Sequence, residues 1–188
     1  GLEDPIGMLS SLFGVDLEAE LFANLGDTGG GYMSDHTGGG GLMSTVGFIS
    51  VKDADAVHGA LQQVATTLNA MAGEHADGYV RVHEREVAGH PLTTLTFPGL
   101  PIPLELSWTV AGNHLWMGAT PQAVVPAIDY AEGGGPGLTA NPRFKELGSK
   151  GLKDATAIAF YDSPRLAGRG YGMVSLGMSA LANAMRSP

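Results

Sequence analysis

The chain contains no cysteine among its 188 residues. Disulfide bonds, thiol nucleophiles and zinc sites built on cysteine are therefore excluded. Positive charge is also scarce, because 10 lysines and arginines face 19 aspartates and glutamates and the formal net charge is −9. The basic residues are scattered along the sequence, whereas nucleic-acid binding depends on clustered Lys and Arg that displace counterions. The composition therefore argues against a nucleic-acid partner, and against binding to anionic lipid for the same reason.

Long apolar runs and targeting signals are missing as well. No predicted helix reaches the roughly 20 apolar residues that span a bilayer, and no basic segment followed by an apolar one marks a leader. The chain begins with Gly1 rather than Met. We therefore expect residues 1–188 to form a single domain that is a segment excised from a longer protein.

Glycine, by contrast, is abundant, and its densest stretch is GDTGGGYMSDHTGGGG at residues 26–41. A phosphate-binding loop follows a buried strand, precedes a helix and, in the Walker form, ends in Gly-Lys-Ser/Thr. Here a helical pattern precedes the glycines, and residues 42–51 follow with a strand pattern. No lysine lies between Gly26 and Val51. We therefore predict a hairpin, in which residues 32–35 pair back on that strand across a glycine-rich turn.

The rest of the sequence alternates helical and strand patterns. Apolar spacing and capping residues predict helices that begin at Pro5, after Asp16, after Asp53, at Pro121, at Pro142 and at Gly172. Further strands are predicted at residues 79–86, 91–97, 104–110, 114–119 and 155–161, the last of them buried on both faces. The sequence thus predicts an α+β fold: an antiparallel sheet of about six strands with amphipathic helices packed mainly on one face.

The predicted terminal helix, residues 172–186, is apolar on most of its surface. Only Ser175, Ser179 and Asn183 form a narrow polar stripe. Because such a helix must be covered, we expect it to pack on this domain, on another protein or on a neighbouring repeat.

Two motifs near this helix lack parts that their chemistry needs. Gly168, Gly170 and Gly172 have the spacing Gly-x-Gly-x-Gly, whereas a dinucleotide-binding loop also needs glycine at Met173 and an acidic residue on a second strand. Ser175 lies inside the predicted helix, whereas a hydrolase serine occupies a strained turn. Neither motif assigns a cofactor or a nucleophile.

The histidines raise the question of a metal site. The segment HEREV at residues 83–87 resembles the start of a zincin helix, but Val87 stands where the second histidine is required, and the segment has a strand pattern. His83 and His90 flank a hairpin turn and could approach each other beside Glu84 or Glu86. Solvated surface side chains are the alternative, and the sequence assigns no metal ligand.

Asp162, which follows the predicted strand at residues 155–161, is the carboxylate to inspect for acid/base chemistry. Paired carboxylates are recognised by their separation in space, which a sequence does not give. The alternative is that Asp162 starts a turn or caps the following residues. The sequence therefore assigns no catalytic residue, leaves enzymatic activity uncertain and leans against it.

Taken in order, several segments resemble an uncharacterised bacterial family that is catalogued as a domain of unknown function. The matching pieces are Gly14-Val15-Asp16-Leu17 through Leu25-Gly26, Val51-Lys52-Asp53, Val87-Ala88-Gly89, Ser107-Trp108-Thr109-Val110 with Leu115, Thr120-Pro121-Gln122-Ala123, Asn141-Pro142-Arg143-Phe144 and Tyr161-Asp162. The resemblance implies an extracytoplasmic protein, commonly anchored near its N-terminus, in which the unit often occurs more than once. It implies no catalytic residues, and residues 29–41 are richer in glycine than is usual for that family.

Three functions are compatible with these observations. The first is a non-enzymatic extracytoplasmic module that acts through protein contacts, which the absent catalytic motifs and the apolar terminal helix favour. The second is a carrier of an apolar ligand or lipid, held in a cavity between sheet and helices. The third is a hydrolase without a recognisable motif, which would require Asp162, a histidine and a serine to meet in one cleft.

Overall fold

The computed structural model of the protein describes residues 4–37, 41–75, 79–87, 89–100, 104–146, 148, 155–162, 178 and 182. The chain falls into two units, Gly1–Asp129 and Tyr130–Pro188. Each unit is described by itself.

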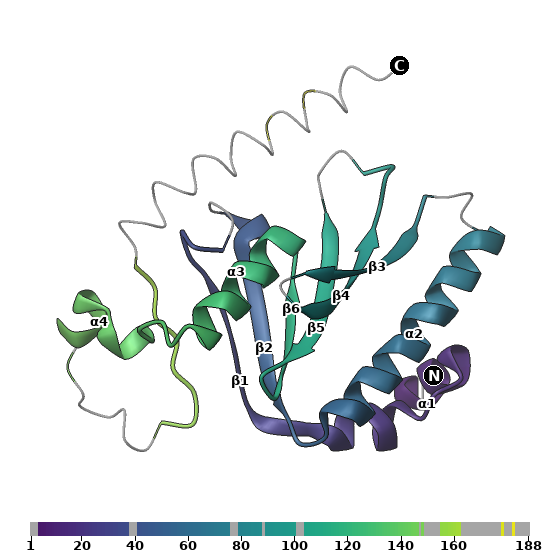
Figure 1. The fold of residues 1–188 in the computed structure, drawn as a ribbon, viewed down its shortest axis with the longest axis horizontal. Helices are drawn as coiled ribbons and strands as arrows, with labels where there is room; N and C mark the ends of the chain where they lie inside the picture. The colour runs from purple at the N-terminus through teal and green to yellow at the C-terminus, as the bar shows by residue number, and fades with distance from the viewer. Residues whose placement is uncertain are drawn as a thin grey trace. The chain divides into compact units, whose positions relative to one another are not determined.

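A six-stranded antiparallel sheet forms the centre of the first unit (Figure 1). Its strands are β1 (Leu25–Met33), β2 (Thr45–Val51), β3 (Arg81–Val87), β4 (His90–Thr96), β5 (Glu105–Ala111) and β6 (His114–Gly118). They lie in the order β1-β2-β6-β5-β4-β3, and every neighbouring pair is antiparallel. The predicted α+β class and antiparallel sheet are confirmed.

The glycine-rich stretch forms a hairpin as predicted, but its first strand is Leu25–Met33 and not residues 32–35. Tyr32 pairs with Val46 and Met33 pairs with Thr45, so β1 runs back along β2. Four glycines lie within β1 itself, and a Cβ atom at one of them, Gly30, would lie 3.2 Å from the Phe48 ring of β2. Glycine there lets an aromatic side chain pack directly on the neighbouring backbone, which is a structural use and not a phosphate loop.

The helices at the N-terminal end begin as predicted, although the second is shorter. The side chain of Asp4 accepts a hydrogen bond from the Gly7 amide (2.8 Å) at the start of α1 (Pro5–Phe13), and Gly14 ends this helix with φ 66°. The helix predicted after Asp16 becomes a π turn, η1 (Leu17–Leu21), and a 3-10 turn, η2 (Phe22–Asn24). The Asn24 side chain bonds to the carbonyls of residues 19 and 20, which closes this segment before β1 begins.

Two longer helices cover opposite faces of the sheet. Residues that alternate along a strand point to opposite faces, and α3 (Pro121–Glu132) packs Val124 and Ile128 against the face that carries Leu92 and Trp116. The other face carries Trp108 and lies towards α2 (Ala54–His75). Because α1 and η1 pack on α2, most helical residues of this unit lie on that side, which we call the α2 face; the opposite side is the α3 face.

The second unit contains η4 (Leu138–Ala140) and α4 (Pro142–Glu146), with the Asn141 side chain accepting from the Arg143 amide at 2.9 Å. The buried strand predicted at residues 155–161 is wrong, because these residues have no regular structure and Ile158 and Tyr161 are exposed. Small and β-branched residues favour strands only where a partner strand is available, and none of the described strands pairs with them.

Most of the predicted helix at residues 172–186 lies outside the described residues. Met178 and Ala182 are described, and both are helical and exposed. Within the described ranges, no helix is both long enough and apolar enough to cross a membrane.

Candidate functional site

The α2 face of the sheet is covered over only part of its area. Leu115 and Thr93 are buried there. Farther along the same face, Met33, Leu106 and Met117 are 45%, 40% and 44% exposed. Side chains of this size and polarity are usually buried, so their exposure on one face of one sheet needs an explanation.

The strand register shows that these exposed side chains form one surface. Met117 of β6 lies directly opposite Trp108 of β5 and opposite Gly47 of β2. Leu106 lies two residues before Trp108, opposite Leu95 of β4. Directly paired residues point to the same side of a sheet and lie about 4.5–5.5 Å apart. We call this set of residues the open sheet face: Met33, Gly47, Leu95, Leu106, Trp108 and Met117.

Gly47 has no side chain to fill its position within the open sheet face. A Cβ atom built there would meet only the Gly30 carbonyl oxygen, at 3.8 Å. The residue paired with it on the outer strand is Gly31, which also lacks a side chain. The floor beside Met117 is therefore bare backbone, flanked by a flexible thioether that can adapt to irregular partners.

Strand β5 distributes its side chains in an unusual way. Its large apolar residues Leu106, Trp108 and Val110 all point to the partly open α2 face. The residues between them, Ser107, Thr109 and Ala111, point to the α3 face and are buried. Strands of antiparallel sheets normally bury the apolar side and solvate the polar side. In β5 the apolar side is the less covered one.

The buried hydroxyls of β5 differ in how they are satisfied. Ser107 donates to the Glu105 carbonyl at 2.7 Å, and its oxygen lies 3.2 Å from the Thr94 hydroxyl. The buried Thr109 hydroxyl has no hydrogen-bond partner. An unsatisfied buried hydroxyl costs about 1–3 kcal/mol. The burial of Thr109 on β5 therefore lowers the free energy of unfolding of the protein.

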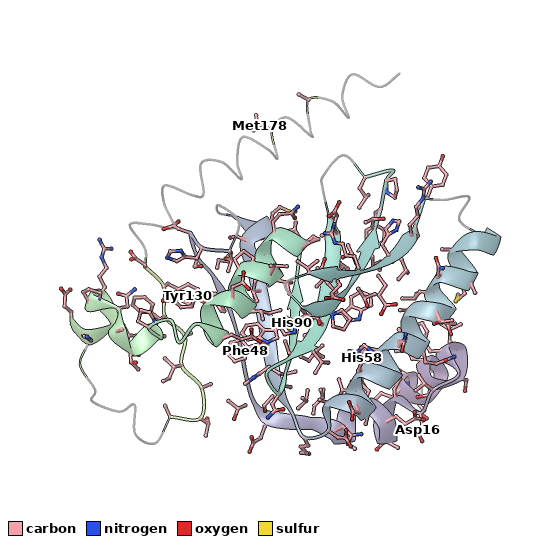
Figure 2. All side chains as sticks on the ribbon, viewed as in Figure 1. Asp16, Phe48, His58, His90, Tyr130 and Met178 are labelled. Carbon is pink, nitrogen blue, oxygen red and sulfur yellow. The ribbon has the colours of Figure 1, made fainter. Side chains whose placement is uncertain are left out.

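Two hollows lie against the sheet in this unit, and both are small. The first, between β4, β5 and α3, is lined by Val87, His90, Leu92, Thr109, Val125 and Ile128 and leaves no room for a water molecule. The second lies beside α2, where His58 (Figure 2) faces Trp108, and has about 10 Å³ available to the centre of a water molecule. A single water needs about that much, so neither hollow can hold an organic ligand.

The histidines considered as metal ligands do not come together. His90 pairs with Val87 at the turn end of the β3–β4 ladder, whereas His83 pairs with Thr94 four residues farther along. This spacing separates the two imidazoles by about 13 Å along the strand, while metal–nitrogen bonds are about 2 Å long. Among the residues that the structure describes, no group of three His, Cys, Asp or Glu side chains has metal-binding geometry.

The carboxylates beside these histidines point the other way. Glu84 and Glu86 pair with Thr93 and Pro91, which places them on the α2 face, whereas both histidines lie on the α3 face. The approach of His83 and His90 beside these glutamates, which the sequence left open as an alternative, does not occur. Alternation along the strand separates the carboxylates from the imidazoles.

Asp162 forms an ion pair with Arg143 of α4. This contact joins the segment at residues 155–162 to α4 within the second unit, where Phe144 also packs edge-to-face on Phe160 with ring centres 5.5 Å apart. The carboxylate that the sequence singles out thus has a structural partner. The other motif residues, Gly168, Gly170, Gly172 and Ser175, lie outside the described residues.

The sequence itself contains a signal for the open sheet face. In ELSWTVA (Glu105–Ala111) the bulky residues occupy one parity and the small or polar residues occupy the other. That pattern predicts an apolar face but not which face the helices cover.

No family model, curated protein or solved structure matches this chain.

Proposed function

We propose that this protein is a non-catalytic module that acts through contact with another polypeptide, and that the open sheet face receives an apolar segment of that partner. The observation that carries the proposal is the orientation of β5. Its Leu106 and Trp108 side chains point to the less covered face, while Ser107 and Thr109 are buried. A sheet that presents its larger apolar side chains outward gains most when a partner covers them.

The energy available at this surface fits a specific but reversible contact. Full burial of a Leu or Met side chain contributes about 1.5–3 kcal/mol. Met33, Leu106 and Met117 are each a little less than half exposed. Covering all three contributes on the order of 2–4 kcal/mol, before the half-buried Trp108 is counted. Aromatic and methionine side chains are also the types enriched at the centres of protein interfaces.

The alternative functions have less support in the described residues. A lipid or apolar-ligand carrier needs a cavity of about 300–1,000 Å³, and the two hollows against the sheet hold at most a single water. A hydrolase needs a histidine and a serine beside Asp162, whose carboxylate instead pairs with Arg143. These observations favour a contact module over a carrier or an enzyme.

The proposed location is outside the cytoplasm. This part of the proposal rests on the resemblance to an extracytoplasmic bacterial family, carried by segments such as Ser107-Trp108-Thr109-Val110 and Asn141-Pro142-Arg143-Phe144. Fusion of the full reading frame to a reporter enzyme that is active only after export tests it. An inactive reporter on a stably expressed fusion would contradict an extracytoplasmic location.

Site-specific photo-crosslinking tests the contact itself. A photoreactive phenylalanine analogue replaces Met117 on the open sheet face or, as a matched control, Gln122, which is exposed on α3. Both proteins are irradiated in cells that express the full chain. We expect a discrete protein adduct from position 117 and none from position 122. The adduct should also be lost when Leu106→Lys is added without a change in melting temperature.

Each other result counts against the proposal. Equal adducts from positions 117 and 122 indicate collisions without a specific surface. Absence of any adduct from position 117 removes the open sheet face as a contact site. A lipid adduct from position 117 overturns the proposal in favour of the carrier function.

A further inference from the structure

A second surface of the first unit is apolar and exposed, and acidic side chains flank it at both ends. We propose that the outward face of α1 is a docking site for a basic amphipathic helix of a partner protein. This surface lies on α1 and η1 and shares no residue with the open sheet face. The inference therefore does not rest on the proposed function.

Helix α1 turns Gly7, Ser10 and Phe13 inward and most of its large apolar residues outward. Gly7 and Ser10 are half-buried, whereas Met8, Leu9 and Leu12 are 59%, 45% and 49% exposed. No residue of α1 is fully buried. An amphipathic helix on a protein surface normally has the opposite orientation.

This orientation is fixed by specific contacts. The Ser10 hydroxyl accepts a hydrogen bond from the Leu17 amide at 3.0 Å, and Thr67 of α2 donates to the Phe13 carbonyl at 3.1 Å. The Phe13 ring packs on a buried cluster formed by Val15, Leu17 and Ala60. The helix is therefore anchored through Ser10 and Phe13, and the exposure of Met8, Leu9 and Leu12 follows from this orientation.

The charged Asp, Glu, Lys and Arg side chains of the first 51 residues are all acidic. The first 51 residues contain no lysine or arginine, and their acidic residues are Glu3, Asp4, Asp16, Glu18, Glu20, Asp27 and Asp35. Asp4 precedes α1, and Asp16 (Figure 2) and Glu18 follow it; all three side chains are exposed. The nearest lysine in sequence, Lys52, donates to the Ala23 carbonyl at 3.0 Å.

These charges select the occupant. An anionic membrane surface or a nucleic acid is repelled by exposed carboxylates. A polypeptide that combines apolar residues with Lys or Arg satisfies both the apolar centre and the acidic rim. Met8 and Leu12 are four residues apart with Leu9 beside them, and such rows form the ridges that pack into the grooves of another helix. A basic amphipathic helix is the partner that fits this surface.

A synthetic amphipathic helix of leucine and lysine is the probe. Its binding to the full chain is measured by isothermal titration calorimetry, with a leucine–glutamate helix of the same pattern and phosphatidylglycerol vesicles as the competing chemistries. We expect the leucine–lysine helix to bind and the other two not to bind. Raising the salt from about 0.1 M to about 1 M should weaken binding, because the Debye length falls from about 10 Å to about 3 Å.

Two variants locate the binding on α1. The double variant L9Q/L12Q should weaken binding at least about tenfold, because two apolar anchors are lost. Glu18→Lys should weaken it up to about fivefold at low salt, the size of one exposed charge pair. Asp129→Lys, which makes the same charge change at an exposed position on α3, should have a smaller effect. Unfolding midpoints check that each variant folds. If the double variant does not fold, binding of the single variant L12Q decides the question.

The inference is overturned if the leucine–lysine helix does not bind, if L9Q/L12Q binds it as well as the natural sequence does, or if vesicles bind instead. Met117→Lys on the open sheet face should leave this binding unchanged. Loss of partner binding at the open sheet face, together with unchanged binding of the leucine–lysine helix at α1, would show that the two surfaces act separately. Loss of binding at α1 alone would leave the proposed function standing.

Discussion

The two faces of the sheet come from the same strands and differ in what covers them. On the α3 face, Val46 and Leu92 are buried under Val124 and Ile128 of α3. On the α2 face, Leu106 and Met117, from the same sheet, are exposed. The difference follows from the placement of the helices and not from the strands, because β5 points its larger apolar side chains to the less covered side.

This comparison separates two uses of apolar residues. On the α3 face they fill a core, so removing atoms leaves a void that the surroundings close only in part. On the open sheet face they already contact water, so removing atoms leaves no void. A matched substitution on each face should therefore have unequal effects on stability, and the inequality tests whether the faces differ as described.

The largest expected effect comes from Leu92→Ala. Leu92 is 1% exposed, and truncation of a buried leucine costs about 2–5 kcal/mol. The matched change Leu106→Ala, on the neighbouring strand and the opposite face, should cost about 1 kcal/mol or less, because this side chain is 40% exposed. Urea unfolding of both variants gives the two free energies of unfolding. Equal losses would show that the open sheet face is as buried as the α3 face.

A smaller loss is expected from Gly118→Ala, again on the α3 face. A Cβ atom at Gly118 would lie 2.7 Å from Cγ2 of Val124 and 3.2 Å from the Thr45 carbonyl oxygen. The valine side chain is stiff because it is branched at Cβ, so α3 must shift. Overpacking of this kind costs about 1–3 kcal/mol. A melting temperature equal to that of the natural sequence would contradict the close packing of α3 on β6.

The sequence was sufficient for the elements whose signals are local. The helices predicted to begin at Pro5 and after Asp53 do begin there, and the side chains of Asp4 and Asp53 cap them by accepting hydrogen bonds from the amides of Gly7 and Ala56. The predicted strand at residues 155–161 failed because its stability depends on a partner strand, which composition does not specify.

The candidate site was harder to predict for a similar reason. The alternation in β5 identifies an apolar side and a polar side, and a sequence-based interpretation assigns the apolar side to the core. Which side is covered depends on where α2 and α3 dock on the sheet, and the alternation within β5 does not specify this. Trp108 therefore has the pattern of a core residue although it lies on the open sheet face. The orientation of α1, with Leu9 and Leu12 outward, depends in the same way on contacts made by other segments.

A gain in stability is expected from Gly47→Ala, the counterpart of Gly118→Ala on the opposite face. A Cβ atom at Gly47 would meet only the Gly30 carbonyl oxygen at 3.8 Å, so the methyl group has space. Glycine in a strand is about 0.5–1 kcal/mol less stable than alanine, because it loses more conformational freedom on folding. Thermal unfolding should show this gain, and a loss would mean that the space beside Met117 does not accommodate a methyl group.

The smallest effect on stability, and the clearest separation of stability from contact, is expected from Met117→Gln. Met117 is 44% exposed, and surface substitutions usually change stability by no more than about 0.5 kcal/mol. The Trp116→Phe background leaves Trp108, directly opposite Met117 in the register, as the single tryptophan to report on the surface by fluorescence. If a partner covers the open sheet face, its addition should shift the Trp108 emission to shorter wavelength, and Met117→Gln should reduce that shift. An emission spectrum that the partner leaves unchanged would mean that this apolar surface stays in water, and the contrast between the two faces would then have no role in binding.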